Sequence, residues 1–149
     1  MDQYKKDCGI NTHDDLCLVI DRDKQSWTEA AISELAQHCH AKKYILALSN
    51  PCFEIWLLIH YCDISTIDEL EKDKIRRNRK GYMKNKLREI IGTYNPSAVN
   101  IDDFWGLTET AINRAKALDP NPAERWPNEI GSRVYILMEK IKRAIDNLN

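Results

Sequence analysis

Two short apolar runs separated by a helical pattern constrain the fold of this chain more than any other feature. Residues 16–20 read Leu-Cys-Leu-Val-Ile, and residues 44–48 read Tyr-Ile-Leu-Ala-Leu. Continuous apolar runs of this length are typical of strands that are covered on both faces. The sequence between them opens with Ser26 and Glu29, a capping-box pair, and continues with helical spacing to about His40. A strand, a helix and a second strand predict a βαβ unit with parallel strands and a right-handed crossover.

The remainder of the chain has the pattern of helices. Residues 51–61 are apolar almost all round, which predicts a buried central helix. Asn50 suits its N-cap and Pro51 suits its first position. Further helices are expected over residues 63–71, 84–94, 102–118 and 129–147. We therefore expect one α/β domain over residues 1–149, with a small parallel sheet joined to a mostly helical C-terminal half.

Composition excludes several classes of protein. With 149 residues, of which 43% are hydrophobic, the chain can bury a core without disulfides or structural metals. Its longest nearly unbroken apolar run, Ile55 to Ile59, is far shorter than the roughly 20 residues that cross a bilayer. The first 15 residues lack the apolar core of a secretory signal, so we expect a cytoplasmic protein without membrane contact. Five cysteines without a Cys-x-x-Cys pair favour reduced thiols over disulfides or structural zinc.

Positive charge is concentrated in one segment. Between Lys72 and Arg88, nine basic residues accompany a single acid, Asp73. Such a stretch is typical of an arm that grips phosphates, here hinged at Gly81. The alternative is a solvated basic loop that folds back on the acidic body. The residues expected to bind nucleic acid are Lys74, Arg76, Arg77, Arg79, Lys80 and Lys84.

Acidic residues follow the first strand and open the central helix. Asp21 and Asp23 are two residues apart, so in extended backbone both point to one side, into the crevice beyond the carboxyl edge of the sheet. Two hard oxygen ligands at that position suit magnesium or manganese, although the pair could instead only end the strand. Glu54 lies near the same edge in an apolar helix and needs a partner, which could be a metal or the helix dipole. We expect His60, nearly two turns further on, to be a core histidine.

Four segments, in this order, resemble the RloB family. The longest reads Ala-Leu-Ser-Asn-Pro-Cys-Phe-Glu-Ile-Trp-Leu-Leu-Ile-His-Tyr over residues 47–61, and the others are residues 19–23, 81–85 and 111–116. The resemblance implies a Toprim-like, metal-dependent nuclease. It also implies an effector of abortive-infection or restriction-linked phage defence, encoded beside an AAA-type ATPase. On this resemblance, Asp21 and Asp23 are the acidic pair of the Toprim fold and Glu54 is an additional acid.

The chain departs from the family pattern at its N-terminus. The resemblance implies an earlier strand with a Glu-Gly element that supplies a general acid or base, but no Glu-Gly occurs here and only about 15 residues precede Leu16. We therefore expect either an N-terminally truncated form or a degenerate member that cannot cut by itself. A two-stranded sheet would also leave an edge open to a missing segment, a partner or a second copy.

These observations favour magnesium- or manganese-dependent cleavage of DNA or RNA phosphodiesters in antiviral defence. Asp21, Asp23 and Glu54 are the expected catalytic residues, and Asp21 and Asp23 are the expected metal ligands. The alternative function is a non-catalytic adaptor that binds the partner ATPase or nucleic acid through the sheet edge and the basic arm. A third possibility is a remnant without activity of its own.

Overall fold

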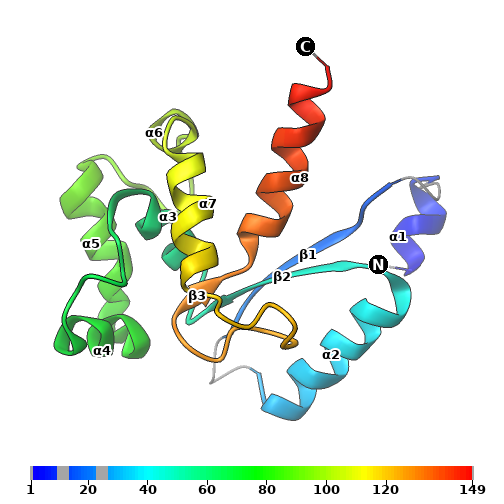
Figure 1. Ribbon diagram of the computed structural model, residues 1–149, viewed down its shortest axis with the longest axis horizontal. Helices are drawn as coiled ribbons and strands as arrows, with labels where there is room; N and C mark the ends of the chain where they lie inside the picture. Colours follow the sequence, from blue (N-terminus) through cyan, green and yellow to red (C-terminus); the bar gives the residue numbers. More distant parts are fainter. Residues whose placement is uncertain (1, 10–13, 23–26, 149) are drawn as a thin grey trace.

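The computed structural model describes residues 2–9, 14–22 and 27–148, and it has the α/β fold that the sequence predicts (Figure 1). Strand β1 (Cys17–Asp21) pairs in parallel with β2 (Ile45–Asn50). Helix α2 (Glu29–Lys42) connects the two strands and packs on one face of the sheet, where it buries Ile32, Ala36 and Cys39. The predicted βαβ unit is therefore confirmed.

A third strand, which the sequence did not predict, completes the sheet. Strand β3 (Gly131–Ser132) lies antiparallel to β2 and makes β2 the central strand. The buried hydroxyls of Ser49 and Ser132 are joined by a hydrogen bond of 2.8 Å across this pairing. A strand of two residues is too short to show the alternation by which strands are recognised. Among the described residues, the outer edge of β1 has no strand partner.

The N-terminal elements differ in detail from the expectation. The N-cap of α2 is Thr28, whose hydroxyl accepts a hydrogen bond of 3.2 Å from the amide of Ala31. Ser26, the expected cap, lies outside the described residues. A short helix, α1 (Asp2–Asp7), precedes the sheet and had no sequence signal.

Helix α3 (Glu54–Tyr61) is the buried central helix that the sequence predicts, with six of its eight residues buried. It begins later than expected, because Asn50 ends β2 and does not cap the helix. The Asn50 side-chain amide donates instead to the carbonyls of residues 127, 128 and 129. The Asn50–Pro51 peptide bond is cis.

The basic segment is neither a flexible arm nor a loop. It forms helix α4 (Glu69–Arg77), the 3-10 turn η1 (Arg79–Gly81) and helix α5 (Tyr82–Ile91). The helix expected over residues 63–71 begins only at Glu69, after the Asp68 carboxylate caps it by accepting from the Glu71 amide at 2.8 Å. Acids one helical turn from the basic residues of α4 offset their repulsion, so the segment can be helical.

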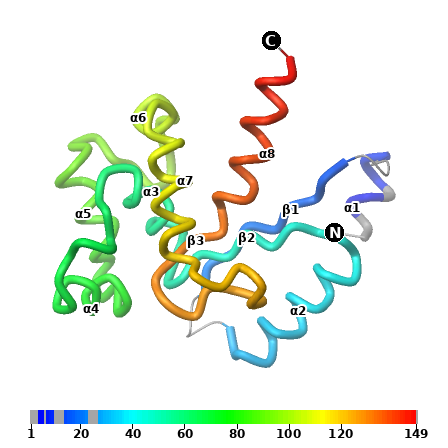
Figure 2. Tube along the Cα trace, in the orientation of Figure 1, coloured from blue at the N-terminus to red at the C-terminus, as the bar shows by residue number. Residues whose placement is uncertain are grey.

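The last helices surround α3 and extend beyond it. The helix expected over residues 102–118 is divided at Gly106 into α6 (Asp102–Trp105) and α7 (Thr108–Ala117). Helix α8 (Val134–Asp146) begins later than expected, because β3 occupies part of the predicted range. The tube in Figure 2 shows α8 crossing the opposite face of the sheet from α2 and projecting away from it.

Helix α3 is the centre of the main core. It packs against α5, α7 and β2, and α8 packs on β2 and α7. Its fully buried Ile55, Leu58 and Ile59 each contribute about 1.5–3 kcal/mol to folding by leaving water. This packing fixes the N-terminal end of α3, where Glu54 lies, against the carboxyl end of β1. None of the described helices is both long and apolar enough to cross a membrane.

Candidate functional site

Asp21 joins the end of β1 to the start of α3. Its Oδ1 atom accepts a hydrogen bond of 2.7 Å from the backbone amide of Phe53, the residue before α3. The carboxylate therefore lies at the positive end of a helix dipole, where negative charge is stabilised. Asp21 is at the sheet edge that the sequence predicts, whereas Asp23 lies outside the described residues. The structure therefore does not test the pairing of these two acids.

The nearly buried Glu54 carboxylate has both a cationic partner and a hydrogen-bond donor. Its side chain is only 12% exposed, and its Oε1 atom lies 3.6 Å from the ammonium of Lys84 on α5. Its Oε2 atom accepts a hydrogen bond of 2.8 Å from the thiol of Cys52. An unpaired carboxylate at this position would cost several kcal/mol. The α3–α5 contact thus supplies a cation to the acid that the sequence singled out.

The Cys52 thiol is the hydrogen-bond donor to the Glu54 carboxylate. Burial raises the pKa of Cys52, and the hydrogen bond to Glu54 raises it further, followed by the charges of Glu54 and Asp21. The thiol therefore remains protonated and acts as a donor, not as a nucleophile. Because Asp21 is hydrogen-bonded to the amide of Phe53, the residue between Cys52 and Glu54, the two acids lie in one cluster at the carboxyl edge of the β1–β2 pair.

The sequence did not single out Asn78, which contacts this cluster, or Tyr94 and Arg88, whose charges interact with it. The side-chain amide of Asn78 donates to the Cys52 sulfur at 3.4 Å. Burial raises the pKa of Tyr94 to about 12, helped by the charges of Glu54 and Cys52 and opposed by the charge of Arg88. Arg88 lies one helical turn after Lys84 on α5. From this i, i+4 spacing, the sequence could have predicted that both side chains lie on one face of the helix. Asn78 and Tyr94 had no local signal, because only the packing of α4 and α5 brings them here.

The donor set of this cluster fits magnesium. Among the residues that the structure describes, no group of three or more His, Cys, Asp and Glu side chains is arranged to hold a metal ion. Magnesium, however, binds through one or two protein carboxylates and completes its shell with water and substrate phosphates. Asp21 and Glu54 supply two such carboxylates, and Asp23 follows Asp21 by two positions.

The six basic residues expected to bind nucleic acid fall into two groups. Lys74, Arg76 and Arg77 on α4 form ion pairs with acids of the same helix, at 3.0–3.5 Å. The side chains of Arg79 and Lys80, in the turn η1, have no ion-pair or hydrogen-bond partner within the part of the chain that the structure describes. Lys84 faces Glu54. The site is therefore lined by cations on its α5 side, and the turn beside it presents two more.

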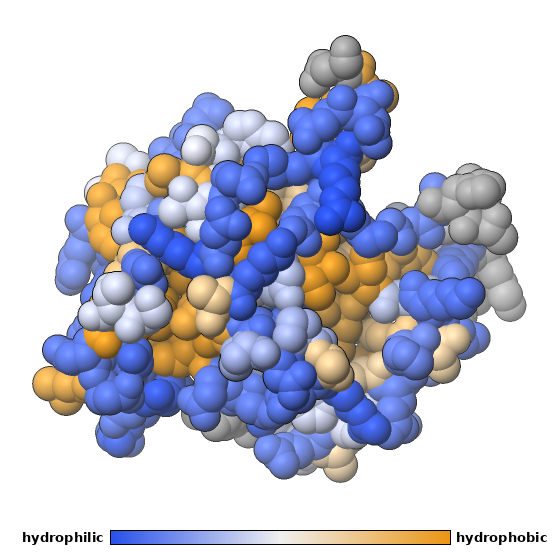
Figure 3. All heavy atoms as spheres, in the orientation of Figure 1, coloured by the Kyte–Doolittle hydropathy of each residue, from blue (hydrophilic) through white to orange (hydrophobic). Residues whose placement is uncertain are grey.

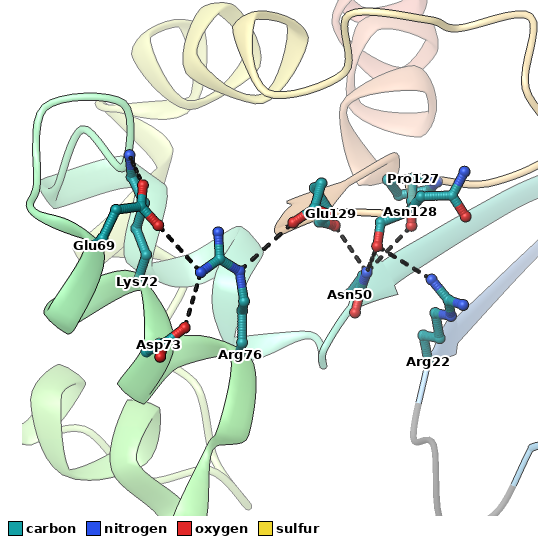
Figure 4. A network of polar contacts seen from close by, with 9 residues as sticks. All are labelled: Arg22, Asn50, Glu69, Lys72, Asp73, Arg76, Pro127, Asn128 and Glu129. Carbon is teal, nitrogen blue, oxygen red and sulfur yellow. Dashed lines mark hydrogen bonds and ion pairs between the residues drawn. The ribbon is translucent and has the colours of Figure 1, made fainter.

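A polar network fixes the loop at residues 127–129 (Figure 4). The Asn50 amide donates to the carbonyls of residues 127–129, and Arg22, which is buried, donates to the carbonyl of Asn128 at 3.2 Å. Arg76 reaches across from α4, with its Nε atom 3.5 Å from Glu129. The network ties this loop to the ends of both parallel strands and to α4. The sequence did not predict this network, because Arg22 and Asn50 bind main-chain carbonyls that are far away in the chain.

His60 is a core histidine, as the sequence predicts. Its ring packs edge-on against Trp56 and Phe104, and its Nδ1 atom lies 2.8 Å from the Trp56 carbonyl. Burial lowers the pKa of His60, which keeps the ring neutral near pH 7. The guanidinium of Arg114 donates to the carbonyls of Ile59 and His60 and so caps the end of α3.

Comparison with known proteins gives one match. The family model described as RloB-like protein matches residues 1–141 of the 149. No curated protein matches the chain, and no solved structure matches it.

Proposed function

The chain belongs to the RloB-like family, and from that premise we propose that it is a Toprim-like, metal-dependent nuclease of a cytoplasmic anti-phage system that cleaves phosphodiester bonds. One observation carries the proposal. At the carboxyl edge of the parallel strands, the Asp21 carboxylate accepts a hydrogen bond from the Phe53 amide, and the carboxylate of the next residue, Glu54, lies beside the ammonium of Lys84. Open α/β sheets bind their ligands at this edge.

Asp21, Asp23 and Glu54 would hold magnesium or manganese. A divalent cation at such a site polarises the phosphate and lowers the pKa of a bound water. The chain's own residues do the rest. Lys84 and Arg88 bind the phosphate oxygens and offset the charge of the acids. Asn78 and Cys52 keep Glu54 in place through the thiol hydrogen bonds.

Cleavage of labelled oligonucleotides in magnesium tests this proposal. The informative variant is Asp21→Asn, because an asparagine oxygen can still accept the hydrogen bond from the Phe53 amide while the charge is lost. Asp15→Asn is the matched control, since Asp15 is exposed and precedes the opposite end of β1. We expect wild type and Asp15→Asn to cut DNA or RNA, and Asp21→Asn to be slower by at least about 100-fold, equivalent to about 3 kcal/mol. Equal cleavage by Asp21→Asn would refute the site assignment.

A non-catalytic adaptor is the second candidate function, and a different observation favours it. The outer edge of β1 is unpaired among the described residues, Val19 on that strand is 43% exposed, and α8 exposes Ile141 and Ile145. Figure 3 shows apolar surface in the angle between α8 and the strands. Such a surface suits a protein partner, for example the AAA-type ATPase expected from the family, or a second copy. Folded wild-type protein that cuts neither DNA nor RNA in magnesium would favour this function.

A further inference from the structure

A hollow of about 350 Å³ lies on the outer side of the α4–α5 pair, apart from the Asp21–Glu54 cluster. Its α4 residues recur at helical spacing and so share one face of that helix. The turn η1 and the first residue of α5 close its other side. The lining residues are Leu70, Asp73, Lys74, Arg77, Arg79 and Tyr82.

The apolar part of the hollow is a fixed aromatic ring and an exposed leucine. The Tyr82 hydroxyl donates to Glu71, and the Lys86 ammonium pairs with the same carboxylate, which holds the ring in place. Leu70 is 70% exposed on a helix whose opposite face buries Ile75. Tyr82 and Leu70 thus offer an apolar surface to a flat partner, and Tyr82 gives it an aromatic face.

The charged part of the hollow is cationic and includes an uncompensated guanidinium. Arg77 pairs with Asp73 at 3.5 Å, a contact between two exposed side chains that contributes little. The Arg79 side chain has no partner among the described residues, so its guanidinium is available to an anion. The turn that carries it is well defined, because Asn78 accepts from the Met83 amide at 3.1 Å and Gly81 adopts a φ of 68°. A planar guanidinium on such a turn suits bidentate contact with a phosphate.

We propose that this hollow binds one unpaired nucleotide of a single-stranded nucleic acid, with the base against Tyr82 and Leu70 and the phosphate on Arg79 and Arg77. Base stacking on an aromatic ring requires an exposed base face, which a duplex does not offer. The volume is within the range of small-molecule sites.

The biological purpose of this binding, but not the binding itself, rests on the proposed nuclease function. Asn78 lies in the same turn as Arg79 and contacts Cys52, so a strand held in the hollow leads to the acidic cluster. The consequence is that the substrate of the proposed cleavage is single-stranded.

Fluorescence anisotropy in EDTA separates this binding from cleavage. The probes are a labelled single strand of about 12 nucleotides, as RNA and as DNA, and a hairpin duplex of matching length. We expect the single strand to bind at least about fivefold more tightly than the duplex, since stacking contributes about 1 kcal/mol or more. Equal affinity for the duplex would overturn the proposal.

Variants locate the binding site. We expect Tyr82→Leu and Arg79→Gln each to weaken single-strand binding at least about fivefold, and Tyr82→Phe, which keeps the ring, to bind nearly as wild type. Arg79→Gln changes an exposed side chain and so leaves the fold intact. Arg143→Gln, an equal loss of charge on α8, is the matched control and should have no effect. Wild-type affinity in Arg79→Gln and Tyr82→Leu would contradict the site.

Competition identifies the source of the nucleotide. Free AMP presents the same base and phosphate chemistry, but a strand adds contacts beyond the hollow. We expect AMP to displace the labelled strand only at concentrations well above those of an unlabelled single strand. Displacement by AMP at equal concentration would contradict the assignment to a strand. Because the assay contains no free metal, binding without any later cleavage in magnesium would refute the nuclease and leave this inference intact.

Discussion

At the scale of single residues, the most deeply buried ion pair among the described residues is one that the sequence did not reveal. Arg133 donates to the two carboxylate oxygens of Asp119 at 2.9 and 3.0 Å, and the Tyr135 hydroxyl donates to the same carboxylate at 3.0 Å. The side chains of the pair are 6% and 3% exposed. Burial, together with the charge of Asp119, raises the pKa of Tyr135 to about 12, so this hydroxyl stays a donor. From the sequence, Asp119 only marked the end of a helix.

We predict that Arg133→Met lowers the free energy of unfolding by about 3 kcal/mol or more, because it leaves the Asp119 carboxylate buried without its cation. Urea denaturation followed by circular dichroism measures this. Lys140→Met is the matched control, since Lys140 pairs with Asp15 at the surface and should change stability by less than about 1 kcal/mol. If Arg133→Met and Lys140→Met had equal free energies of unfolding, the buried ion pair would contribute no more to stability than the surface pair.

Asp21 illustrates how far a local sequence pattern reaches. Its position at a strand end was predictable, because an apolar run stops there. Its hydrogen bond to the Phe53 amide was not, because it joins residues that are 32 positions apart. For the same reason, Asn50 was wrongly expected to cap α3, although its amide is used by the loop at residues 127–129.

At the scale of elements, the α4–α5 pair shows how acids stabilise a basic segment. Glu71 accepts from the Tyr82 hydroxyl, pairs with Lys86 on α5, and lies 3.2 Å from Lys74. The contact with Lys86, followed by that with Tyr82, lowers the pKa of Glu71 to about 2 from its ordinary value of 4.5. One carboxylate therefore links the two helices that carry seven of the nine basic residues in the 72–88 segment.

This link predicts a pH dependence with a definite sign. Since the pKa of Glu71 is lower in the folded state, its contribution is fully present above pH 4.5 and is lost as the pH falls towards 2. We predict that Glu71→Gln lowers stability at pH 7 and flattens the decline in stability between these pH values. Urea denaturation at a series of pH values measures this, with Glu89→Gln on the exposed side of α5 as the control. A wild-type pH profile in Glu71→Gln would contradict the assigned role.

Elements with their own run of apolar residues could be predicted from the sequence. Elements that form only because a distant segment packs beside them could not. The β1–α2–β2 unit and the buried α3 follow directly from their apolar residues. By contrast, β3 has two residues and exists only because β2 lies beside it. The basic segment was expected to be a flexible arm or a loop because its charges were counted without their i, i+3 and i, i+4 partners.

At the scale of the whole molecule, the polar cluster and the apolar surface lie in different places. Hydrogen bonds and an ion pair link Asp21 to Phe53, Glu54 to Lys84 and Asn78 to Cys52 around the start of α3. Figure 1 shows α3, α4 and α5 grouped together beyond the carboxyl end of the strands. Helix α8, on which Ile141 and Ile145 are exposed, projects away from the sheet (Figure 2). With a net charge of −1, the molecule as a whole does not attract nucleic acid, so the proposed binding would depend on the local basic surface of α4, η1 and α5. The sheet edge at which Asp21 and Glu54 lie could be predicted from the sequence. The position of Lys84 beside Glu54 could not, because it depends on the packing of α5 against α3.

The central claim is that Asp21 belongs to a site for a divalent cation, and calorimetric titration of the folded protein with manganese tests it most directly. The account predicts binding by wild type and by Asp15→Asn, and its loss in Asp21→Asn, while thermal unfolding of Asp21→Asn stays close to that of wild type because the hydrogen bond from the Phe53 amide is kept. Asp21→Ala, which loses that bond, should in addition unfold about 1 kcal/mol more easily. Manganese binding that is unchanged in a folded Asp21→Asn, or absent from folded wild type, would contradict the account.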